Sequence, residues 1–310
     1  MKKNKILMIS CVLMGIGAIM AGAGYICGGY KGLKETKGFV FDHHNYEDND
    51  YIKEDKELEV FKNMELNVDF GDVEIVQGDK YRIVSEYNKK IYNLSYDVED
   101  EKLVVTNKLI KKNKVFDFDG GDDSDLKIKI YIPKETCLDN LNLKVDSGNL
   151  MLEDLKCKEL YTSNEFGNIN GKNIETDNFE GNLESGSLNL DTFTAENAII
   201  KNEFGNVMGK SFITNGLDLD MESGKIDISG KLSGKNNINS EFGKINIKND
   251  LPKDECGYDI HVDLGRCLIN GNKSGNGKKS NYDHESYNET ANNMFKVNCS
   301  SGDVELDFNN

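Results

Sequence analysis

A glycine that recurs at a fixed spacing sets the strongest constraint on the fold of this chain. The six glycines lie 19 residues apart without interruption: Gly148, Gly167, Gly186, Gly205, Gly224 and Gly243. An acidic residue precedes each of them by two positions, and an aliphatic residue follows each by two positions. A period of this length indicates stacked repeats, because a single unit is too small to bury its own apolar face.

The composition of the repeat favours a β-solenoid over a helical array. Paired-helix repeats need about 33 residues or more, whereas a coil of two or three short strands fits the shorter period. Aliphatic residues alternate with polar ones, and the chain holds only two prolines. Across Gly224 the alternation within residues 217–228 shifts by one position. The chain is therefore predicted to be all-β, with a corner at each glycine.

A second alternation lies at the residue before each glycine, where Ser and Phe take turns: Ser147, Phe166, Ser185, Phe204, Ser223 and Phe242. Two positions earlier, aliphatic residues accompany Ser, and small polar residues accompany Phe. This pattern suggests volume compensation in a densely packed core. Either Phe and Ser stack alternately in one column of 19-residue coils, or two such segments form one flattened coil. We favour the 19-residue coil.

The repeat loosens at both ends of a solenoid domain predicted to cover residues 58–310. An upstream copy contains Gly71, and downstream copies contain Gly265 and Gly302. Regular coils are predicted for residues 137–250. Residues 270–293 are rich in Gly, Ser, Asn and Lys and are predicted to form a long surface loop. Residues 294–310 would then form the closing coil.

The first 30 residues resemble a membrane-insertion segment. Three lysines precede an apolar run from Ile6 to about Tyr30 that contains no acidic residue. About 20 apolar residues can span a bilayer, so the length favours a transmembrane helix that acts as an uncleaved anchor. The Ala21-Gly-Ala23 segment also fits a cleavable signal. The order of basic start and apolar run predicts a single-pass protein of the cell membrane, with the bulk extracellular.

The charge of the chain restricts its partners. Residues 31–57 are mostly polar and acidic and are predicted to form a stalk or linker. The whole chain has a formal net charge of −16. Nucleic-acid binding requires a basic face, so this class of partner is excluded. Flat adsorption on anionic lipid is disfavoured for the same reason.

The cysteines show no zinc-binding spacing. Five of the seven lie beyond the apolar run. Cys256 and Cys267 could form a disulfide, although buried free thiols are the favoured interpretation.

The acidic residues of the repeat form the main candidate metal site. The acid column comprises Asp146, Glu165, Glu184, Glu203, Glu222 and Glu241. Strand parity directs these side chains outward, and stacked coils place them about 4.8 Å apart. Six like charges repel unless they are screened or bridged, so a calcium ladder is one hypothesis. A solvated face relieved by nearby lysines such as Lys225 and Lys244 is the favoured alternative; no other cofactor is expected.

The remaining polar clusters are weaker candidates for a metal-binding or catalytic site. Residues 117–125 are rich in Asp and are predicted to form a hairpin tip between residues 104–106 and 126–130, with calcium binding as the alternative. His43 and His44 lie in the stalk, where they could contact a metal, whereas His261 and His284 have no evident partner. The chain contains no G-x-S-x-G, HExxH or P-loop motif, and no catalytic residue is assigned.

The segment from Leu126 to Leu150 contains a predicted strand, Pro133, a second predicted strand and then Ser147-Gly148. This order resembles the entry into the repeats of a bacterial putative adhesin family. The resemblance covers roughly residues 58–310. It implies a right-handed parallel β-helix, a location in the cell envelope, a domain of unknown function and no established enzyme activity.

These observations together predict a non-enzymatic surface protein of the cell envelope that presents a rigid, acidic β-solenoid to an envelope polymer or protein. A β-helix enzyme that acts on polysaccharide is one alternative, and it would require a groove with clustered acidic and basic residues. A self-assembling structural solenoid is the other alternative.

Overall fold

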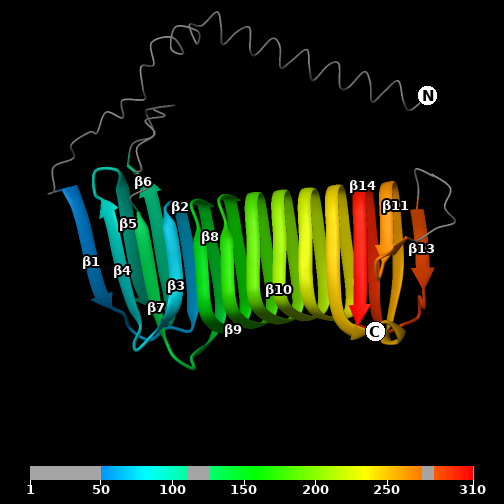
Figure 1. Ribbon diagram of the computed structural model, residues 1–310. Helices are drawn as coiled ribbons and strands as arrows, with labels where there is room; N and C mark the ends of the chain where they lie inside the picture. The colour runs from blue at the N-terminus through cyan, green and yellow to red at the C-terminus, as the bar shows by residue number, and fades with distance from the viewer. Residues whose placement is uncertain (1–49, 111–125, 274–282, 310) are drawn as a thin grey trace, which may run out of the picture. The chain divides into compact units, whose positions relative to one another are not determined.

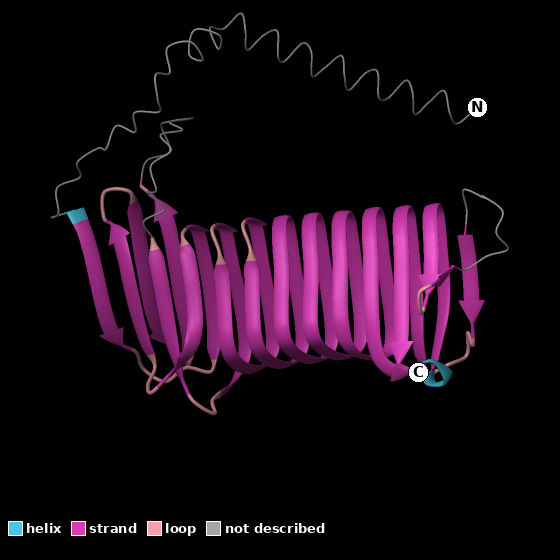
Figure 2. Ribbon diagram, in the orientation of Figure 1, coloured by secondary structure: helices cyan, strands magenta, loops and turns pink. Residues whose placement is uncertain are grey.

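The computed structural model describes residues 50–110, 126–273 and 283–309, which wind into a parallel β-solenoid with antiparallel strands at both ends (Figures 1 and 2). None of the helices in these ranges is long and apolar enough to cross a membrane. The predicted anchor, residues 1–30, lies outside the described residues.

The strands follow one another with few interruptions. The first group comprises β1 (Tyr51–Glu57), β2 (Asn63–Phe70), β3 (Asp72–Gly78), β4 (Arg82–Asn88), β5 (Tyr92–Glu99) and β6 (Lys102–Leu109). The coils continue through β7 (Lys127–Pro133), β8 (Cys137–Ser147), β9 (Leu150–Phe166) and β10 (Ile169–Pro252). A short 3-10 helix, η3 (Lys253–Glu255), leads to β11 (Cys256–Ile269), β12 (Asn272–Lys273), β13 (Asp283–Tyr287) and β14 (Asn293–Asn309).

Each regular coil is one repeat of the sequence. In the parallel pairing of β10 with β9, Ile169 lies beside Leu150 and Asn178 lies beside Glu159, an offset of 19 residues. The 19-residue coil is therefore confirmed, and the flattened double-length coil is wrong. The aliphatic residues two positions after the glycines are all buried: Leu150, Ile169, Leu188, Val207, Ile226 and Ile245.

The corners require glycine for two physical reasons. Gly205 has φ of +145°, a backbone conformation that residues with a side chain rarely adopt. A Cβ atom on Gly205 would also lie only 1.7 Å from the carbonyl oxygen of Gly186 in the neighbouring coil. The coils thus stack glycine upon glycine, with no room for a side chain between them.

The predicted closing coil does not close the solenoid. β14 pairs in parallel with β10 on one side and with β11 on the other, so it lies between them (Figure 1). The chain therefore forms the outer coil, β11, before it returns to fill the position next to β10. The outermost coil of the solenoid is therefore formed by β11 and not by β14.

Antiparallel strands cover both ends of the solenoid and correct two predicted boundaries. The segment 270–293, predicted as a loop, contains β12 and β13, which both pair antiparallel with β11. At the other end, residues 51–57 of the predicted stalk form β1, which pairs antiparallel with β4. Capping strands are expected because an uncovered coil exposes unpaired backbone groups.

The predicted hairpin around the acidic segment 117–125 is wrong. β6 pairs with β2 and β5, whereas β7 pairs with β3 and β4, so the two flanking strands are not partners. The acidic segment itself lies outside the described residues. The cause of the error is that sequence neighbours need not be sheet neighbours in a solenoid.

The described cysteines contain no disulfide between Cys256 and Cys267, both of which are buried. Cys157 and Cys299 are also buried, whereas Cys137 is exposed. Burial raises the pKa of Cys157 to about 12 and that of Cys256 to about 11. The interpretation as buried thiols therefore holds for these residues, with Cys137 as the exception.

Candidate functional site

The phenylalanines that precede the corner glycines point to solvent, which corrects the prediction that they fill the core. The exposed fractions are 60% for Phe166, 54% for Phe204 and 56% for Phe242. Because neighbouring glycines stack in contact, the corner has no interior volume to receive an aromatic ring. The ring must therefore lie outside, whatever its apolar character.

The position before the corner glycine also holds large apolar residues toward the two ends of the solenoid. Phe70 pairs with Ser147, and Ser147 pairs with Phe166. At the other end, Ser301 pairs with Phe242 on one side and with Leu264 on the other. Large apolar side chains and serines therefore alternate along the whole row of described corners.

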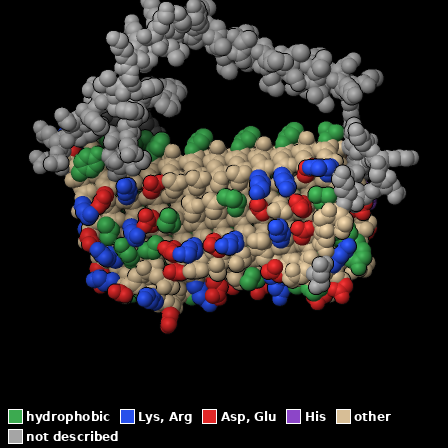
Figure 3. All heavy atoms as spheres, viewed as in Figure 1, with side chains coloured by type: hydrophobic (Ala, Val, Ile, Leu, Met, Phe, Trp, Pro, Cys, Tyr) green, Lys and Arg blue, Asp and Glu red, His purple; other side chains and the backbone are tan. Residues whose placement is uncertain are grey.

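We call the exposed members of this row the hydrophobic corner column: Phe70, Phe166, Phe204, Phe242 and Leu264. Figure 3 shows hydrophobic side chains projecting at intervals along one long edge of the solenoid. Adjacent strands lie about 4.8 Å apart, so members of the column on every second coil are separated by about 9.5 Å. The column thus forms a line of regularly spaced apolar groups.

Buried asparagines support two of the coils that carry an exposed Phe, those of Phe166 and Phe204. The side-chain amide of Asn164 donates to the carbonyl oxygen of Gly148 at 2.8 Å, and that of Asn202 donates to Gly186 at 3.3 Å. In the coils with Ser, buried aliphatic residues such as Leu183 take this position. In these two coils the polar residue therefore satisfies a corner carbonyl group, and it does not compensate for the volume of Phe, which lies outside the core.

Volume compensation does operate at another position of the repeat. A Cβ atom on Gly171 would lie 2.7 Å from a methyl carbon of Leu190, and one on Gly209 would lie 3.3 Å from a methyl carbon of Ile228. These glycines leave room for larger residues in neighbouring coils.

The acid column points outward as predicted. Glu184, Glu203, Glu222 and Glu241 are exposed, whereas Asp146 and Glu165 are partly buried. The ammonium group of Lys144 lies 3.1 Å from Asp146 and 3.8 Å from Glu165. The calcium ladder stays an untested prediction.

The two lysines predicted to relieve the acid column pair with other carboxylates. Lys225 forms an ion pair with Asp227, and Lys244 forms one with Glu305. Within the described residues, Lys144 is a lysine that does pair with members of the acid column.

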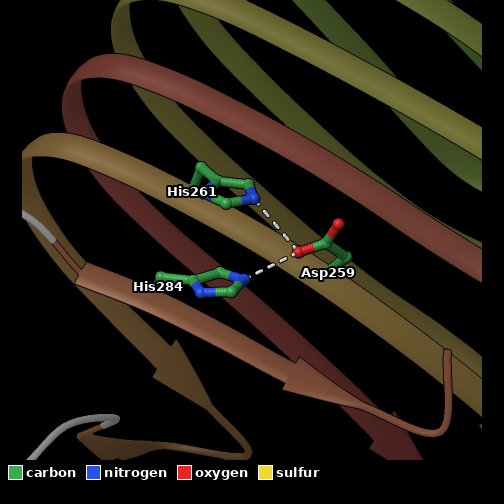
Figure 4. A group of neighbouring side chains, drawn as sticks. All are labelled: Asp259, His261 and His284. Carbon is green, nitrogen blue, oxygen red and sulfur yellow. Dashed lines mark hydrogen bonds and ion pairs between the residues drawn. The ribbon is translucent and has the colours of Figure 1, made fainter.

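His261 and His284, for which the sequence indicates no partner, meet at Asp259 (Figure 4). The Nε2 atoms of His261 and His284 lie 3.1 Å and 2.9 Å from the same carboxylate oxygen. Within the described ranges, this is the one group in which three such ligand atoms lie within 4.8 Å of one another. Sequence reasoning missed it because β13 lies in the segment predicted to be a loop. His43 and His44 lie outside the described residues.

A groove of about 610 Å³ crosses five neighbouring coils and contains both acidic and basic residues. Its lining residues include Glu153, Lys172, Asp191, Lys210 and Asp227. The alternative of a polysaccharide-cleaving enzyme requires this combination of residues. Whether the groove could act in that way depends on the protonation state of its carboxyl groups.

Two carboxylates of the groove are held in ion pairs. Lys172 lies 2.8 Å from Glu153, and this hydrogen bond raises the pKa of Lys172. Burial alone would raise the pKa of Asp227, but the hydrogen bond from Lys225 and other favourable contacts outweigh it, and the pKa is lowered. Asp227 therefore stays charged, which does not suit it to donate a proton as a general acid.

Comparison with solved structures finds proteins of low identity over most of the chain. A putative adhesin from Bacteroides fragilis is 14% identical, with a TM-score of 0.47, and the alignment covers 84% of this chain and 97% of that chain. A putative adhesin from Parabacteroides distasonis is 11% identical, with a TM-score of 0.47 and coverage of 82% and 96%. A putative lipid binding protein from Parabacteroides distasonis is 16% identical, with a TM-score of 0.44 and coverage of 84% and 97%.

No curated protein matches the chain. The family model described as Toastrack DUF4097 matches residues 61–307, nearly the whole of the solenoid. This match confirms the resemblance carried by the segment from Leu126 to Leu150. The chain belongs to the Toastrack DUF4097 family.

Proposed function

We propose that this protein is a non-enzymatic, membrane-anchored protein of the cell envelope, and that its right-handed solenoid binds an extended polysaccharide along the hydrophobic corner column. The apolar, basic-flanked segment 1–30 supports the anchor and the extracellular location. Family membership and the similarity to proteins described as putative adhesins are compatible with a binding role.

The observation that carries the proposal is the two-coil spacing of the column. Exposed aromatic rings offer flat apolar faces, and such faces pack well against the C–H faces of sugars. In a β-1,4-linked glycan each sugar is turned over relative to the one before, so the same face returns at every second sugar. The length of that disaccharide repeat is close to the separation of about 9.5 Å between members of the column. Each Phe would therefore meet an equivalent sugar.

The charge around the column selects among polymers. An acidic residue directly precedes every member of the column: Asp69, Glu165, Glu203, Glu241 and Asp263. Anionic polymers would be repelled by this row of like charges. Carboxylates can instead accept hydrogen bonds from sugar hydroxyl groups. The most suitable partner is therefore an uncharged β-1,4-linked glycan strand.

The test compares two sets of substitutions in the full-length protein, purified in detergent. The variant Phe166→Ser/Phe204→Ser/Phe242→Ser removes the centre of the column. Its matched control, Met151→Ser/Met208→Ser/Ile213→Ser, removes apolar side chains that are also exposed but lie at other positions of the repeat. Binding of cellohexaose and chitohexaose is measured by calorimetry for each protein.

We expect saturable binding that weakens at least tenfold in the Phe variant and persists in the control. Binding should also fall steeply when the oligosaccharide is too short to reach two members of the column. Equal affinity in the Phe variant and the wild type would contradict the proposal. Release of shorter sugars would support an enzyme instead, and concentration-dependent assembly that only the Phe variant abolishes would support a self-assembling solenoid.

A further inference from the structure

We propose that Asp259, His261 and His284 form a binding site for a divalent transition metal of the zinc class. The site lies at the outer end of the solenoid and does not depend on the proposed function of the corner column.

Strand geometry brings the three side chains together. Asp259 and His261 are two positions apart on β11, so both point to the same face of the strand. His284 on β13 lies directly opposite His261 in the antiparallel pairing. Side chains at directly opposite positions are neighbours, which places the second imidazole beside the first.

The distances are close to those of a metal site. Two donors on a tetrahedral zinc ion with bonds of about 2.0–2.2 Å are separated by about 3.3–3.6 Å. In the structure, the two imidazole Nε2 atoms lie 3.1 Å and 2.9 Å from one oxygen of Asp259. The two rings are nearly parallel, at 7°, and their centroids are 4.1 Å apart, so both Nε2 atoms face the same region (Figure 4). Small rotations of the side chains would admit an ion.

The donor set distinguishes between metals. Two imidazoles and one carboxylate suit zinc and similar ions, whereas calcium prefers a shell made of oxygen atoms alone. A metal ion binds imidazole through a ring nitrogen that carries no proton, and each ring here turns its Nε2 toward Asp259. All three side chains are partly exposed, between 30% and 43%. Further coordination positions would therefore be open to water or to a ligand from a partner.

A metal here would fasten the end strand to the solenoid. β13 covers β11, which is the outermost coil, through a pairing of five residues, Tyr258 to Val262 with Asp283 to Tyr287. Tyr258 and Tyr287 stack at the other end of this pairing, with ring centroids 5.6 Å apart. An ion held by both strands would add a second link and would raise the stability of this cap by mass action.

The experiment measures zinc binding by calorimetry and by the melting temperature of full-length protein. Zinc should bind with one equivalent and raise the melting temperature. In His261→Ala and in His284→Ala, the affinity for zinc should fall at least tenfold, and the rise in melting temperature at the same zinc concentration should become smaller. The chain contains four histidines, so His43→Ala/His44→Ala serves as the matched control and should bind like the wild type. Circular dichroism of the metal-free variants reports whether each remains folded.

Cobalt provides a second measurement that does not depend on folding stability. Bound cobalt should give visible absorption bands typical of nitrogen and oxygen ligands, and these bands should disappear in His284→Gln. A thiolate charge-transfer band would place the ion on a cysteine and overturn the proposal. Loss of binding in the His43→Ala/His44→Ala variant, or no binding by the wild type, would also overturn it.

Discussion

Phe242 lies beside Ser301 in the parallel pairing of β10 with β14, although the whole of β11 comes between them in the sequence. The last segment of the chain therefore supports two coils at once, one on each side. Removal of β14 would take away the parallel partner that each of them has on that side.

Deletion of residues 293–310 should consequently loosen both neighbours of β14. We expect hydrogen exchange to accelerate in residues 256–269 and in residues 235–252, while coils around Leu150 and Ile169 keep their protection, because solenoid units depend mainly on their nearest neighbours. Exchange measured by mass spectrometry on the full-length and shortened proteins reports this. Unchanged protection of residues 256–269 would show that β11 is stable without β14.

The stacked corner glycines should tolerate no side chain. Gly205→Ala would place its Cβ atom 1.7 Å from the carbonyl oxygen of Gly186 at an unfavourable φ, and should lower the free energy of unfolding by about 3 kcal/mol or more. Gly216→Ala is the matched control, because its nearest neighbour would be 3.4 Å away. The control should change the free energy of unfolding by less than about 1 kcal/mol. Denaturant titration compares the two, and similar losses would argue against the steric explanation.

The stability of the terminal coils should fall in acid. The hydrogen bond from Arg266 lowers the pKa of Asp303 below its ordinary value of 3.8. A carboxyl whose pKa is lower in the folded state contributes stability above its unfolded pKa, and that stability is lost as the pH falls through the folded pKa. The loss therefore belongs to the range below pH 3.8. In denaturant titrations from about pH 5 down to about pH 2, Asp303→Asn should show a smaller decline than wild type. Equal declines would assign the acid sensitivity to other groups.

The thiols should differ sharply in reactivity. Cys137 is exposed, whereas burial raises the pKa of Cys157 to about 12, so the reactive thiolate is scarce at Cys157. Brief treatment of the folded protein with iodoacetamide, followed by peptide mapping, should modify Cys137 first. Cys157 should become modified only when denaturant is added. Modification of Cys157 at the rate of Cys137 would show that the coil opens readily.

Calcium provides a test of the acid column. Because Lys144 already neutralises part of it, and the remaining glutamates are exposed to solvent, we expect calcium to leave the melting temperature unchanged. The variant Glu203→Gln/Glu222→Gln/Glu241→Gln is the comparison. A rise in melting temperature with calcium that this variant abolishes would establish the column as a calcium site.

The repeat predicts the coil and its corners well because both depend on local physical rules. Position 167 requires glycine because the backbone bends there and neighbouring coils stack closely. Position 169 requires an apolar residue because the chain returns to the core there. Such requirements recur in every coil, so the sequence displays them several times. The sequence pattern predicts the wrong direction for Phe166, because apolar character alone does not reveal that a corner lacks interior space.

The position of β14 between β10 and β11 depends on pairing between strands that are far apart in the sequence. The sequence nevertheless contains a signal for this position. In sequence order, Phe242 is followed by Leu264 and then by Ser301, which breaks the alternation of large and small corner residues. In spatial order Ser301 comes between the other two, and the alternation is restored. The histidine cluster offers no comparable signal, because it exists only once β13 pairs with β11.

The alternation of the hydrophobic corner column also constrains how a solenoid of this kind can change in length. Deletion of the coil that contains Ser185 would bring Phe166 and Phe204 to adjacent corners and shift every later member out of phase. Loss or duplication of two consecutive coils would leave the edge as it was. The outer edge of the solenoid therefore repeats every two coils, although the stacked corner glycines repeat in every coil.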